Sequence, residues 1–451
     1  MKTISVPSHA ARVIAALEAA GFEAWCVGGC VRDSLLGKIP ADWDVATSAR
    51  PEEILACFPG RPVMEVGRRH GTIGIVTEKG LVEVTTYRID GDYTDCRRPV
   101  QVRFTRRLKE DLSRRDFTVN AMACHPVRGI QDPLGGQEDL RRGQLRCVGS
   151  PPARFQEDAL RILRCLRFAA VLGFQIEPET RRAALECREL LREISGERIR
   201  QELTKLLCGS RMGPVLEENA PVIFAALPEL EPLYGCGQEN PYHQYDCWEH
   251  TVHTAEAVPA EPVLRWAALL HDCGKPSAKT YDSQGTAHFY GHAEAGASLA
   301  GELLARLRFP RREREEIMLL VERHGEILPM GEKRVKRLLG ALGPKKFWEL
   351  LALVRGDISA QADWAAAERL PLLDQAEARA RDILAQDSCL TVKDLAVNGR
   401  DLMDLGCRPG PALGKTLKSL LEEVLSGELA NEKPGLLARA GELLGDGARL
   451  M

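Results

Sequence analysis

One stretch near the N-terminus, AWCVGGCVRDSLLGKIPADWD at residues 24–44, constrains this chain more than any other. It begins with a short apolar run typical of a strand, which the pair Gly28 and Gly29 interrupts before an amphipathic turn of helix. Asp42 and Asp44 follow, separated by one residue. On an extended strand two such side chains lie on the same face, because side chains alternate from residue to residue. We therefore expect a strand, a glycine turn and a helix, followed by a strand that carries two neighbouring carboxylates.

This stretch has the chemistry of a magnesium and triphosphate site. Two neighbouring carboxylates repel each other and remain ionised most easily when a cation lies between them. Ligation by oxygen alone suits Mg²⁺, which takes one or two protein carboxylates and completes its shell with water and substrate phosphates. A glycine pair also lets a phosphate approach the backbone closely. The alternative is a solvent-facing pair of aspartates in a turn beside an ordinary glycine loop.

A third acid lies in a predicted hairpin. The segments GTIGIVT and LVEVTTYR alternate as strands do, and a Lys-Gly turn joins them. Glu83 lies between two valines in the second segment. It is either an edge residue that faces water or a third carboxylate that faces the metal. We favour the metal, because Asp42 and Asp44 otherwise lack a third partner.

Two later stretches place arginines where a nucleotide could meet them. DLSRRDFTVNAMA at residues 111–123 predicts a helix with a basic N-terminal end, in which Arg115 holds a triphosphate and Asp116 orients it. The alternative is a surface helix with a local salt bridge. A second predicted helix, FQEDALRILRCLRFAA, covers residues 155–170.

Four charged residues recur every three positions along this second predicted helix: Asp158, Arg161, Arg164 and Arg167. That spacing places them on one helical stripe. Asp158 and Arg161 offer acceptors and a planar donor fork, which can bond the edge of a nucleobase, while the other two arginines can take phosphate. The alternative is an ion-paired surface.

Composition limits the classes of partner. The 451 residues are too many for one core and suggest about three units. The net charge of −3 excludes a general basic surface, so a polyanion must meet a local patch, such as the arginines between residues 97 and 142. No apolar run approaches the ~20 residues of a membrane span. The 14 cysteines include no C-x-x-C pair, which favours reduced thiols and a cytoplasmic protein. We expect neither a membrane nor a DNA partner.

The pattern of the chain changes at Pro151, where strand signals stop and helical periodicity begins. We therefore expect an α+β protein with an N-terminal mixed part and a helical remainder. The expected divisions are a head at 1–149, a helical neck at 150–234, a metal-binding helical domain at 235–365 and a helical tail at 366–451.

Metal-ligating side chains recur along the third of these regions. An adjacent His-Asp before Gly-Lys-Pro, at His271 and Asp272, is the most specific part of the pattern. Imidazole together with carboxylate suits divalent transition metals. Any one of these histidines alone is more often a surface or core residue, but together they predict a metal site. The expected ligands are His250, His271, Asp272 and Asp357, with His292 and His324 as further candidates.

Taken in order across Val27–Leu203, the motifs resemble the nucleotidyltransferase superfamily of DNA polymerase beta, and more closely the bacterial class II tRNA nucleotidyltransferases and their poly(A) polymerase relatives. The motifs are VGGCVRDSLLG, DWD, EVTTYR followed by YTDCRRPVQVRF, EDLSRRDFTVNAMA, RFQEDALRILRCLRF and ISGERIRQEL. The later histidines resemble the HD metal-phosphohydrolase domain, and the segment beyond Leu390 resembles the C-terminal unit of the Gram-positive-like branch.

The resemblance implies a polymerase-beta-like head with a small mixed sheet, followed by an all-α neck, an HD body and a tail that hold tRNA mainly through shape and backbone contacts. It implies that Asp42 and Asp44 hold two Mg²⁺ ions, with Glu83 as the third acid. The implied nucleotide contacts are Gly29, Arg32 and Arg115 for the triphosphate, Asp158 and Arg161 for the base, and Arg164 and Arg167 for the rest of the nucleotide site.

The implied reaction is the template-independent addition of C, C and A to the 3′ end of tRNA from CTP and ATP. Members that add only C lack an intact loop at residues 91–107, and this chain keeps YTDCRRP there, so we expect A addition. Addition of A alone and poly(A) synthesis remain alternatives. The HD part adds a second hypothesis, a phosphohydrolase for 2′,3′-cyclic or 2′-phosphate ends that uses Ni²⁺, Mn²⁺ or Mg²⁺. A third, a tRNA-binding module with a decayed head, conflicts with the complete acids and arginines.

Overall fold

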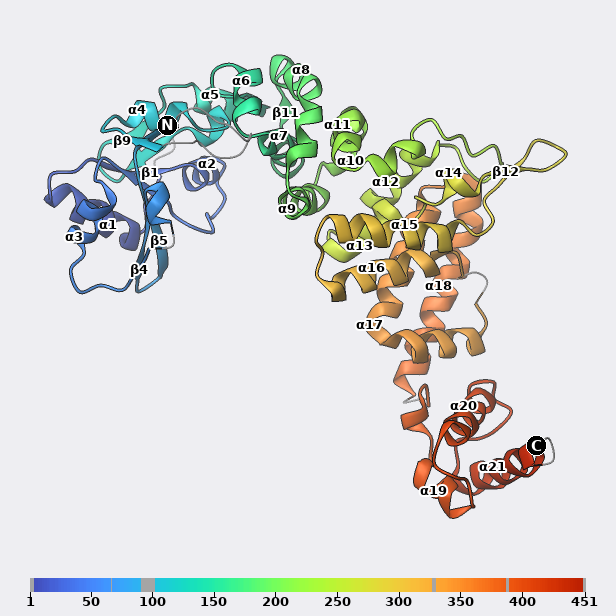
Figure 1. The fold of residues 1–451 in the computed structure, drawn as a ribbon. Coiled ribbons are helices and arrows are strands. Elements are labelled where there is room, and N and C mark those ends of the chain that lie inside the picture. Colours follow the sequence, from blue (N-terminus) through green and yellow to red (C-terminus); the bar gives the residue numbers. More distant parts are fainter. Residues whose placement is uncertain (1–3, 66, 91–101, 327–329, 387–388, 449–451) are drawn as a thin grey trace. The chain divides into compact units, whose positions relative to one another are not determined.

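The computed structural model describes residues 4–65, 67–90, 102–326, 330–386 and 389–448 (Figure 1). The chain forms two compact units, Met1–Glu231 with Arg306–Arg308, and Pro232–Ala305 with Phe309–Met451. The predicted α+β class is confirmed, with a mixed sheet in the N-terminal part and helices beyond it. The finer division into four parts remains a prediction. Among the described helices, none is long and apolar enough to cross a membrane.

The first unit begins with a mixed sheet that, in the described residues, has seven strands in the order β3-β4-β5-β2-β1-β8-β9. Its strands are β1 Ala24–Val27, β2 Val45–Thr47, β3 Val63–Met64, β4 Thr72–Thr77, β5 Gly80–Thr86, β8 Ala123–His125 and β9 Gly129–Gln131. β2 and β5 run parallel, and the other printed neighbours are antiparallel. The predicted hairpin is thus confirmed as β4 and β5. A separate antiparallel pair joins β6 Arg88–Asp90 to β7 Val102–Phe104.

Helices cover both faces of the central strands. α1 Ser8–Ala19 and α3 Pro51–Cys57 pack with the inward side chains of β2, β4 and β5 in one apolar cluster, and Figure 1 shows both helices on the same side of β4 and β5. The other face packs in a second cluster that includes Leu112 of α4 Leu108–Ser113. Burial on both faces fixes the position of the central strands. It thereby also fixes the segments in and beside these strands that carry the acids.

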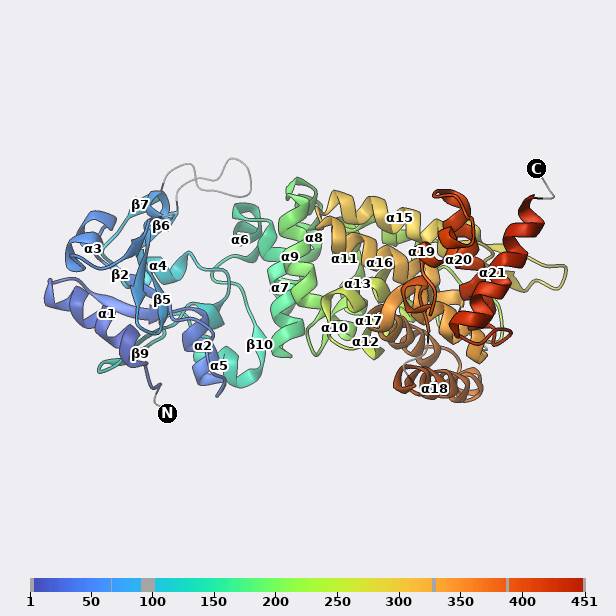
Figure 2. The same ribbon diagram turned by 90° about the horizontal axis from the view of Figure 1, so that it is seen from below.

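The rest of the first unit is mostly helical. Its helices are α2 Gly29–Leu35, α5 Gly136–Arg142, α6 Pro151–Glu157, α7 Leu160–Leu172, α8 Pro178–Glu186, α9 Gly196–Leu207, α10 Met212–Glu218 and α11 Ala220–Ala226. A short parallel pair, β10 Gln144–Leu145 and β11 Gln175–Ile176, joins the sheet region to the helices. α7 packs along α9, and Figure 2 shows the two helices side by side. This packing buries the apolar side of α7 and leaves its arginines for polar partners.

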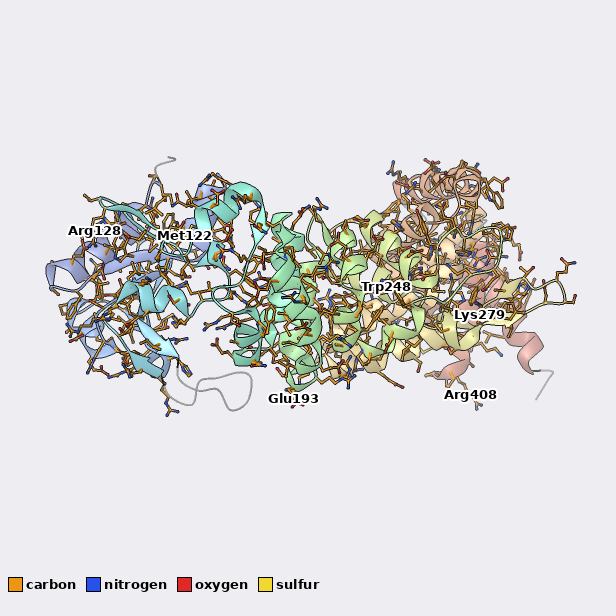
Figure 3. The ribbon with its side chains drawn as sticks, turned by 90° about the horizontal axis from the view of Figure 1, so that it is seen from above. Met122, Arg128, Glu193, Trp248, Lys279 and Arg408 are labelled. Atoms are coloured by element: carbon orange, nitrogen blue, oxygen red, sulfur yellow. The ribbon has the colours of Figure 1, made fainter. Side chains whose placement is uncertain are left out.

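The second unit is helical apart from one small hairpin, β12 Thr280–Tyr281 with β13 Ala287–His288. Its helices are α12 Cys247–Ala257, α13 Pro262–Leu270, α14 Lys275–Ala278, α15 His292–Arg306, α16 Arg311–Arg323, α17 Glu332–Ser359, α18 Asp363–Ala385, α19 Gly399–Asp404, α20 Pro411–Leu425 and α21 Lys433–Ala448. Trp248, labelled in Figure 3, is one of its largest fully buried side chains. A separate apolar cluster holds α19, α20 and α21 together.

The two aspartates of the opening stretch do not lie in a strand, as the spacing predicted. The ladder of β2 begins one residue later, at Val45, and Asp44 contributes only its carbonyl, which accepts from the backbone N–H of Val27 at 3.0 Å. The apolar residues that follow can be buried between two helical layers, whereas the acids cannot. Asp42 and Asp44 therefore lie on the extended segment that enters β2.

The predicted helix over residues 111–123 is wrong. α4 ends at Ser113, Phe117 has an extended backbone, and a short 3₁₀ turn at Thr118–Asn120 leads into β8. The Asp116 carboxylate accepts from the backbone N–H of Phe117 at 2.8 Å and from the Asn120 side chain at 3.1 Å. Such local side-chain bonds compete with helical ones, which explains the break.

The predicted helix over residues 155–170 is interrupted at Asp158. This residue has an extended backbone (φ −142°, ψ 101°), and its carboxylate accepts from the backbone N–H of Leu160 at 3.2 Å, in the first turn of α7. Asp158 therefore lies before the helical stripe, and only Arg161, Arg164 and Arg167 lie on α7. Most of the segment 91–107 lies outside the described residues, including YTDCRRP, although its end at Val102–Phe104 is strand β7 and not loop.

Candidate nucleotide site and metal centre

The three predicted acids of the head lie together at the entry to β2. The parallel register pairs Val45 with Val84, so one residue earlier Asp44 lies beside Glu83, on the sheet face opposite to those two valines. Burial first, and then the charges of Asp42 and Glu83, raise the pKa of Asp44 to about 6, against the opposing charge of Arg115. The charges of Asp42 and Glu83 thus act on Asp44, and the three carboxylates together form an all-oxygen donor set, which fits Mg²⁺.

The glycine turn beside these acids accepts only glycine at Gly28. Its φ is +81°, a conformation that L side chains rarely adopt, and a Cβ there would lie 3.0 Å from Nη1 of Arg115. Gly29 then begins α2. Arg115 reaches this turn while its Nη2 lies 3.2 Å from Oδ2 of the buried Asp111. Its carboxylate partner is therefore Asp111 and not the predicted Asp116.

Three of the predicted arginines surround one aromatic ring, that of the buried Phe168. The guanidinium carbons of Arg32, Arg164 and Arg167 lie 5.1, 5.4 and 3.9 Å from its centroid. The quadrupole of an aromatic ring attracts cations that lie over its face. The ring of Phe168 therefore holds the three guanidinium groups near one another although their charges repel. Sequence reasoning missed this role, because a phenylalanine on an apolar helix face predicts only core packing.

Each arginine of this group also has a polar partner. Arg32 donates to Asn120 at 2.7 Å, Arg164 pairs with Asp116 at 2.6 Å, and Arg167 pairs with Glu202 at 2.6 Å. The pKa of Arg167 is nevertheless lowered, first by burial and then by its cationic neighbours. An anion placed beside these arginines would relieve that strain on the charged form.

The structure does not bring Asp158 and Arg161 together as an ion pair. Arg161 is buried, and its Nη1 donates to Glu157 at 2.6 Å, while Asp158 pairs with Arg198 of α9 at 3.2 Å. The two residues lie on either side of the start of α7. Glu157 and Arg198 thus hold the two predicted base-reading side chains, and neither partner was among the predicted site residues.

The predicted ligands of the second unit converge. In each of four histidines Nδ1 faces a backbone carbonyl, of Ala360 (3.3 Å), Ala268 (2.8 Å), Phe289 (2.7 Å) and Val321 (2.7 Å) for His250, His271, His292 and His324. A carbonyl that accepts from Nδ1–H leaves Nε2 without a proton and free to bind a metal. Sequence spacing alone could not show this orientation.

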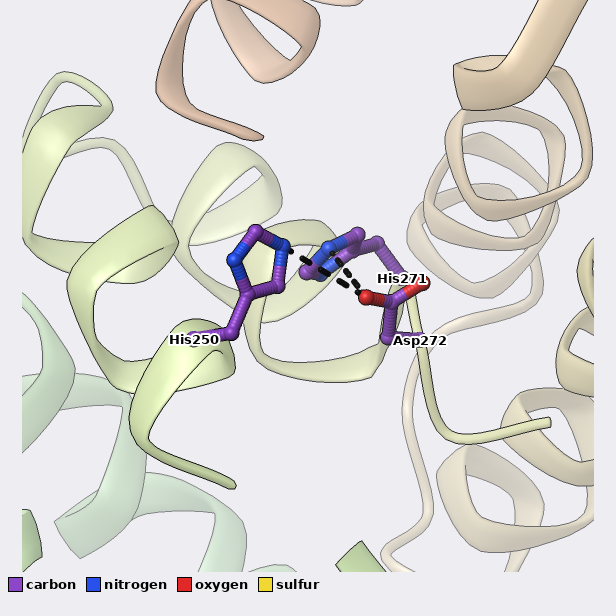
Figure 4. Close-up of side chains that lie close together, drawn as sticks. All are labelled: His250, His271 and Asp272. Atoms are coloured by element: carbon purple, nitrogen blue, oxygen red, sulfur yellow. Dashed lines mark ion pairs between the residues drawn. The ribbon is translucent and has the colours of Figure 1, made fainter. Parts of the chain in front are cut away.

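All four Nε2 atoms point to the carboxylate of Asp272. His250 and His271 lie 3.5 and 3.1 Å from Oδ2, and His292 and His324 lie 3.5 and 3.7 Å from Oδ1. Figure 4 shows the first of these groups. Each group of three brings its ligand atoms within 4.8 Å of one another, which is a spacing that can hold an ion. Asp272 is shared, so its two oxygens can serve two cations.

The charges at this centre favour a bound cation. Burial alone would raise the pKa of Asp272, but His271 and Lys275 hold it well below its usual range. His271 Nε2 is buried, lies 3.1 Å from Oδ2 of Asp272 and makes no well-oriented hydrogen bond, whereas Oδ2 itself has the ammonium of Lys275 at 2.6 Å. A buried nitrogen left in this state is costly, and a divalent transition metal would satisfy it. The sixth predicted ligand, Asp357, lies with Oδ1 3.0 Å from Nε2 of His250.

Known proteins are similar to this chain along nearly its whole length. A CCA-adding enzyme of Levilactobacillus brevis is 34% identical over 429 residues, which cover 94% of this chain and 95% of the relative. The chain belongs to the CCA-adding enzyme family. A second CCA-adding enzyme, of Geobacillus stearothermophilus, is 33% identical with 94% of each chain covered. The chain is therefore a nucleotidyltransferase.

Further comparisons agree with this CCA-adding enzyme fold. The crystal structure of the Bacillus stearothermophilus CCA-adding enzyme in complex with CTP matches with a TM-score of 0.73 and 30% identity, and covers 98% of both chains. Family models match the Poly A polymerase head domain at residues 24–146, the HD domain at 242–369 and tRNA nucleotidyltransferase domain 2 at 357–440. The predicted resemblance and the presence of an HD domain are thus confirmed.

Two side chains at the HD centre were missed by sequence reasoning. Lys275 places Nζ 2.6 Å from Oδ2 of Asp272, and the ring of His243 lies 5.3 Å from that of His250. Burial, with help from Lys275, lowers the pKa of His243 to about 3. Lys275 follows Asp272 by three residues and was a detectable signal, whereas His243 lies in an irregular segment without a pattern.

Proposed function

We propose that this member of the CCA-adding enzyme family adds C, C and A to the 3′ end of tRNA, with CTP and ATP as substrates and pyrophosphate as the second product. The observation that carries the proposal is the set of three carboxylates beside a glycine turn that Arg115 contacts. The names of the relatives and the CTP complex of the 30% identical structure support it.

In this proposal Asp42, Asp44 and Glu83 hold Mg²⁺, which their oxygen-only donor set fits. When bound, Mg²⁺ would favour ionisation of the tRNA 3′-hydroxyl and stabilise the charge of the leaving pyrophosphate. The protein supplies the arrangement of the three acids, because the β2 and β5 register places Asp44 next to Glu83 before any ligand arrives. Such preorganisation avoids the cost of gathering the charges during the reaction.

The triphosphate would lie between the glycine turn and the arginines around Phe168. Gly29 begins a helix, where backbone N–H groups face outward and attract anions, although this helix is short. Arg115 lies next to Gly28 and Arg32 next to Gly29, and Arg164 and Arg167 extend the positive region along α7. Guanidinium groups suit phosphate because they present planar, paired donors.

Base selection is proposed for Asp158 and Arg161. On their base-pairing edge, cytosine and adenine each present an amine donor next to a ring-nitrogen acceptor. Uracil and guanine present a carbonyl acceptor next to a ring N–H donor on the same edge. A carboxylate accepts from the amine and a guanidinium donates to the ring nitrogen, so one pair of side chains selects both correct bases. The contacts with Arg198 and Glu157 would hold the two groups at the required separation.

Single labelled nucleotides test this proposal. On tRNA that lacks its last three residues, CTP alone should add C, ATP alone should add nothing, and both together should give A-terminated products. Absence of incorporation in the presence of Mg²⁺ would contradict the proposal. A long ladder of A residues would instead identify a poly(A) polymerase, and A addition only to tRNA that already ends in CC would identify an A-adding enzyme.

The pKa of Asp44 gives a pH dependence for Mg²⁺. Because burial and the neighbouring acids raise this pKa to about 6, protons compete with Mg²⁺ below that pH. The Mg²⁺ concentration for half-maximal transfer should therefore rise about tenfold per pH unit below 6 and be nearly constant above pH 7. Rates measured over a Mg²⁺ series at pH 5, 6, 7 and 8 check this, and a midpoint that does not change between pH 5 and 7 would contradict it.

We infer a second activity for the HD domain, hydrolysis of 2′,3′-cyclic or 2′-phosphate ends with a divalent metal such as Ni²⁺, Mn²⁺ or Mg²⁺. The observation that favours it is the complete set of ligands, in which four Nε2 atoms and two carboxylates meet. Water would attack phosphorus, one P–O bond would break, and the ribose hydroxyl would leave with a proton. Lys275 lies where it can bind the phosphate charge.

A further inference from the structure

Residues of the HD centre line a cavity of about 610 Å³. Pockets of roughly 300–1,000 Å³ hold ligands larger than a phosphate group. The metal-ligand cluster, with Asp272, Lys275 and His292, takes only part of the lining. The cavity therefore has room for a group attached to the phosphate, and its remaining walls indicate the chemistry of that group.

Aromatic side chains make up much of these remaining walls. Tyr290 is 80% exposed and lies parallel to His288, with ring centroids 5.4 Å apart and an interplanar angle of 9°. Tyr242 is 48% exposed, and its ring lies 5.1 Å from that of Trp364. Tyr290, His288 and Tyr242 all line the cavity. Aromatic residues form only 5% of this chain, so several exposed rings at one cavity are unusual. They indicate a ligand with a flat face that can stack on them.

Tyr290 lies close in sequence to a candidate ligand of the metal centre. It lies two residues before His292, whose Nδ1 faces the carbonyl of Phe289 at 2.7 Å. His288 is held from the other side by Asp282, at 3.1 Å from its Nε2. The stacked pair Tyr290 and His288 is thus anchored at both ends, and it lines the same cavity as Asp272.

We propose that this cavity binds a nucleobase, which stacks on Tyr290 while its ribose phosphate reaches the Asp272 centre. The ligand class is a nucleoside 2′,3′-cyclic phosphate or a nucleoside 2′-phosphate, either free or at the end of an RNA strand. This inference rests on the proposed phosphohydrolase function and adds a specificity site to it. Stacking of one base on an aromatic side chain is worth about 5- to 150-fold in affinity, and it accepts every base because each has a flat face.

Binding and hydrolysis by the full chain test the inference with two ligands that differ only in the base. The first is adenosine 2′,3′-cyclic phosphate, and the second is the same cyclic phosphate on a 1-O-methyl ribose, which has no base. For the wild-type protein, we expect KM and Kd to be at least about tenfold lower for the adenosine ligand. Tyr290→Ser should raise both values for the adenosine ligand about tenfold and leave them unchanged for the methyl riboside, and Tyr290→Trp should restore them.

Tyr281→Ser is the matched control, because Tyr281 is a 57% exposed tyrosine of β12, whose partner strand β13 ends two residues before Tyr290, and it is not among the residues that line the cavity. It should change neither ligand's KM. If the wild-type protein hydrolyses both ligands equally well, or if Tyr290→Ser leaves the adenosine values unchanged, the base site is wrong and the phosphohydrolase stands. If no metal supports hydrolysis, the phosphohydrolase fails, and the Kd values of the two ligands still decide whether the base site exists.

Discussion

Replacement of Asp44 by Asn should lower nucleotidyl transfer by at least about 1,000-fold, without loss of folding. The expected loss follows from the removal of one charged oxygen ligand from a set of three, since metal stabilisation of transition-state charge is worth several kcal/mol, and about 1.4 kcal/mol corresponds to a tenfold change in rate. Single-turnover transfer of CMP to truncated tRNA at saturating Mg²⁺ measures it. Asp42→Asn should have an effect of the same order.

Stability provides an internal control for Asp44→Asn. The pKa of this carboxyl is raised to about 6 in the folded protein, so its ionisation opposes folding above that pH. Without Mg²⁺, the substitution should raise the free energy of unfolding by about 2 kcal/mol at pH 8, and this gain should shrink as the pH falls through 6. Glu138→Gln, which breaks two exposed ion pairs on α5, should alter neither transfer nor stability. Transfer that survives in Asp44→Asn would remove Asp44 from the metal site.

Replacement of His271 by Gln should lower hydrolysis of 2′,3′-cyclic phosphates by at least about 100-fold. Loss of a hydrogen-bonding partner of a metal ligand already costs about 10- to 100-fold in metal affinity or activity, and His271 is proposed as a ligand itself. Its Nε2 is fully buried and lies 3.1 Å from Asp272, so nothing else in the described part of the chain can take its place without rearrangement. Calorimetric titration with Ni²⁺ or Mn²⁺ should show weaker binding in parallel.

Two comparisons make this experiment specific. His253→Gln changes a half-exposed histidine on the same helix as His250, outside the cluster, and should leave hydrolysis unchanged. Transfer of CMP should also be unchanged in His271→Gln, because the proposed acids of that reaction lie in the first unit. Hydrolysis that is as fast in His271→Gln as in the wild type would refute the proposed HD activity.

The sequence predicted the elements whose signals are local. The apolar run before Gly28, the hairpin that carries Glu83 and the helical remainder all follow from periodicity and from glycine, and the structure has them. The sequence also indicated the candidate metal ligands of the second unit, because an adjacent His-Asp pair is a distinctive signal, and the structure brings these side chains close together. The sequence thus indicated which residues belong to the candidate sites. It did not indicate which partners position their side chains.

The errors arose where a side chain bonded its own backbone. Asp116 and Asp158 each accept from a backbone N–H one or two residues later, and each lies where the structure interrupts a helix that apolar periodicity would continue. Contacts between distant segments were equally hidden. Arg164 was expected to take phosphate and pairs with Asp116, 48 residues earlier, while the ring of Phe168 gathers arginines from two helices. Tertiary packing determines these partners, and spacing carries no information about them.

The sequence of the added nucleotides tests the central claim most directly. Three tRNA substrates that lack three, two or one of their terminal residues are incubated with the protein, Mg²⁺ and all four nucleoside triphosphates, and the 3′ ends are then sequenced. The account predicts that all three substrates end in CCA, with no U or G and no further residue, because one site selects both bases and the tRNA limits the length. Products that end in runs of A, or in mixed bases, would contradict it.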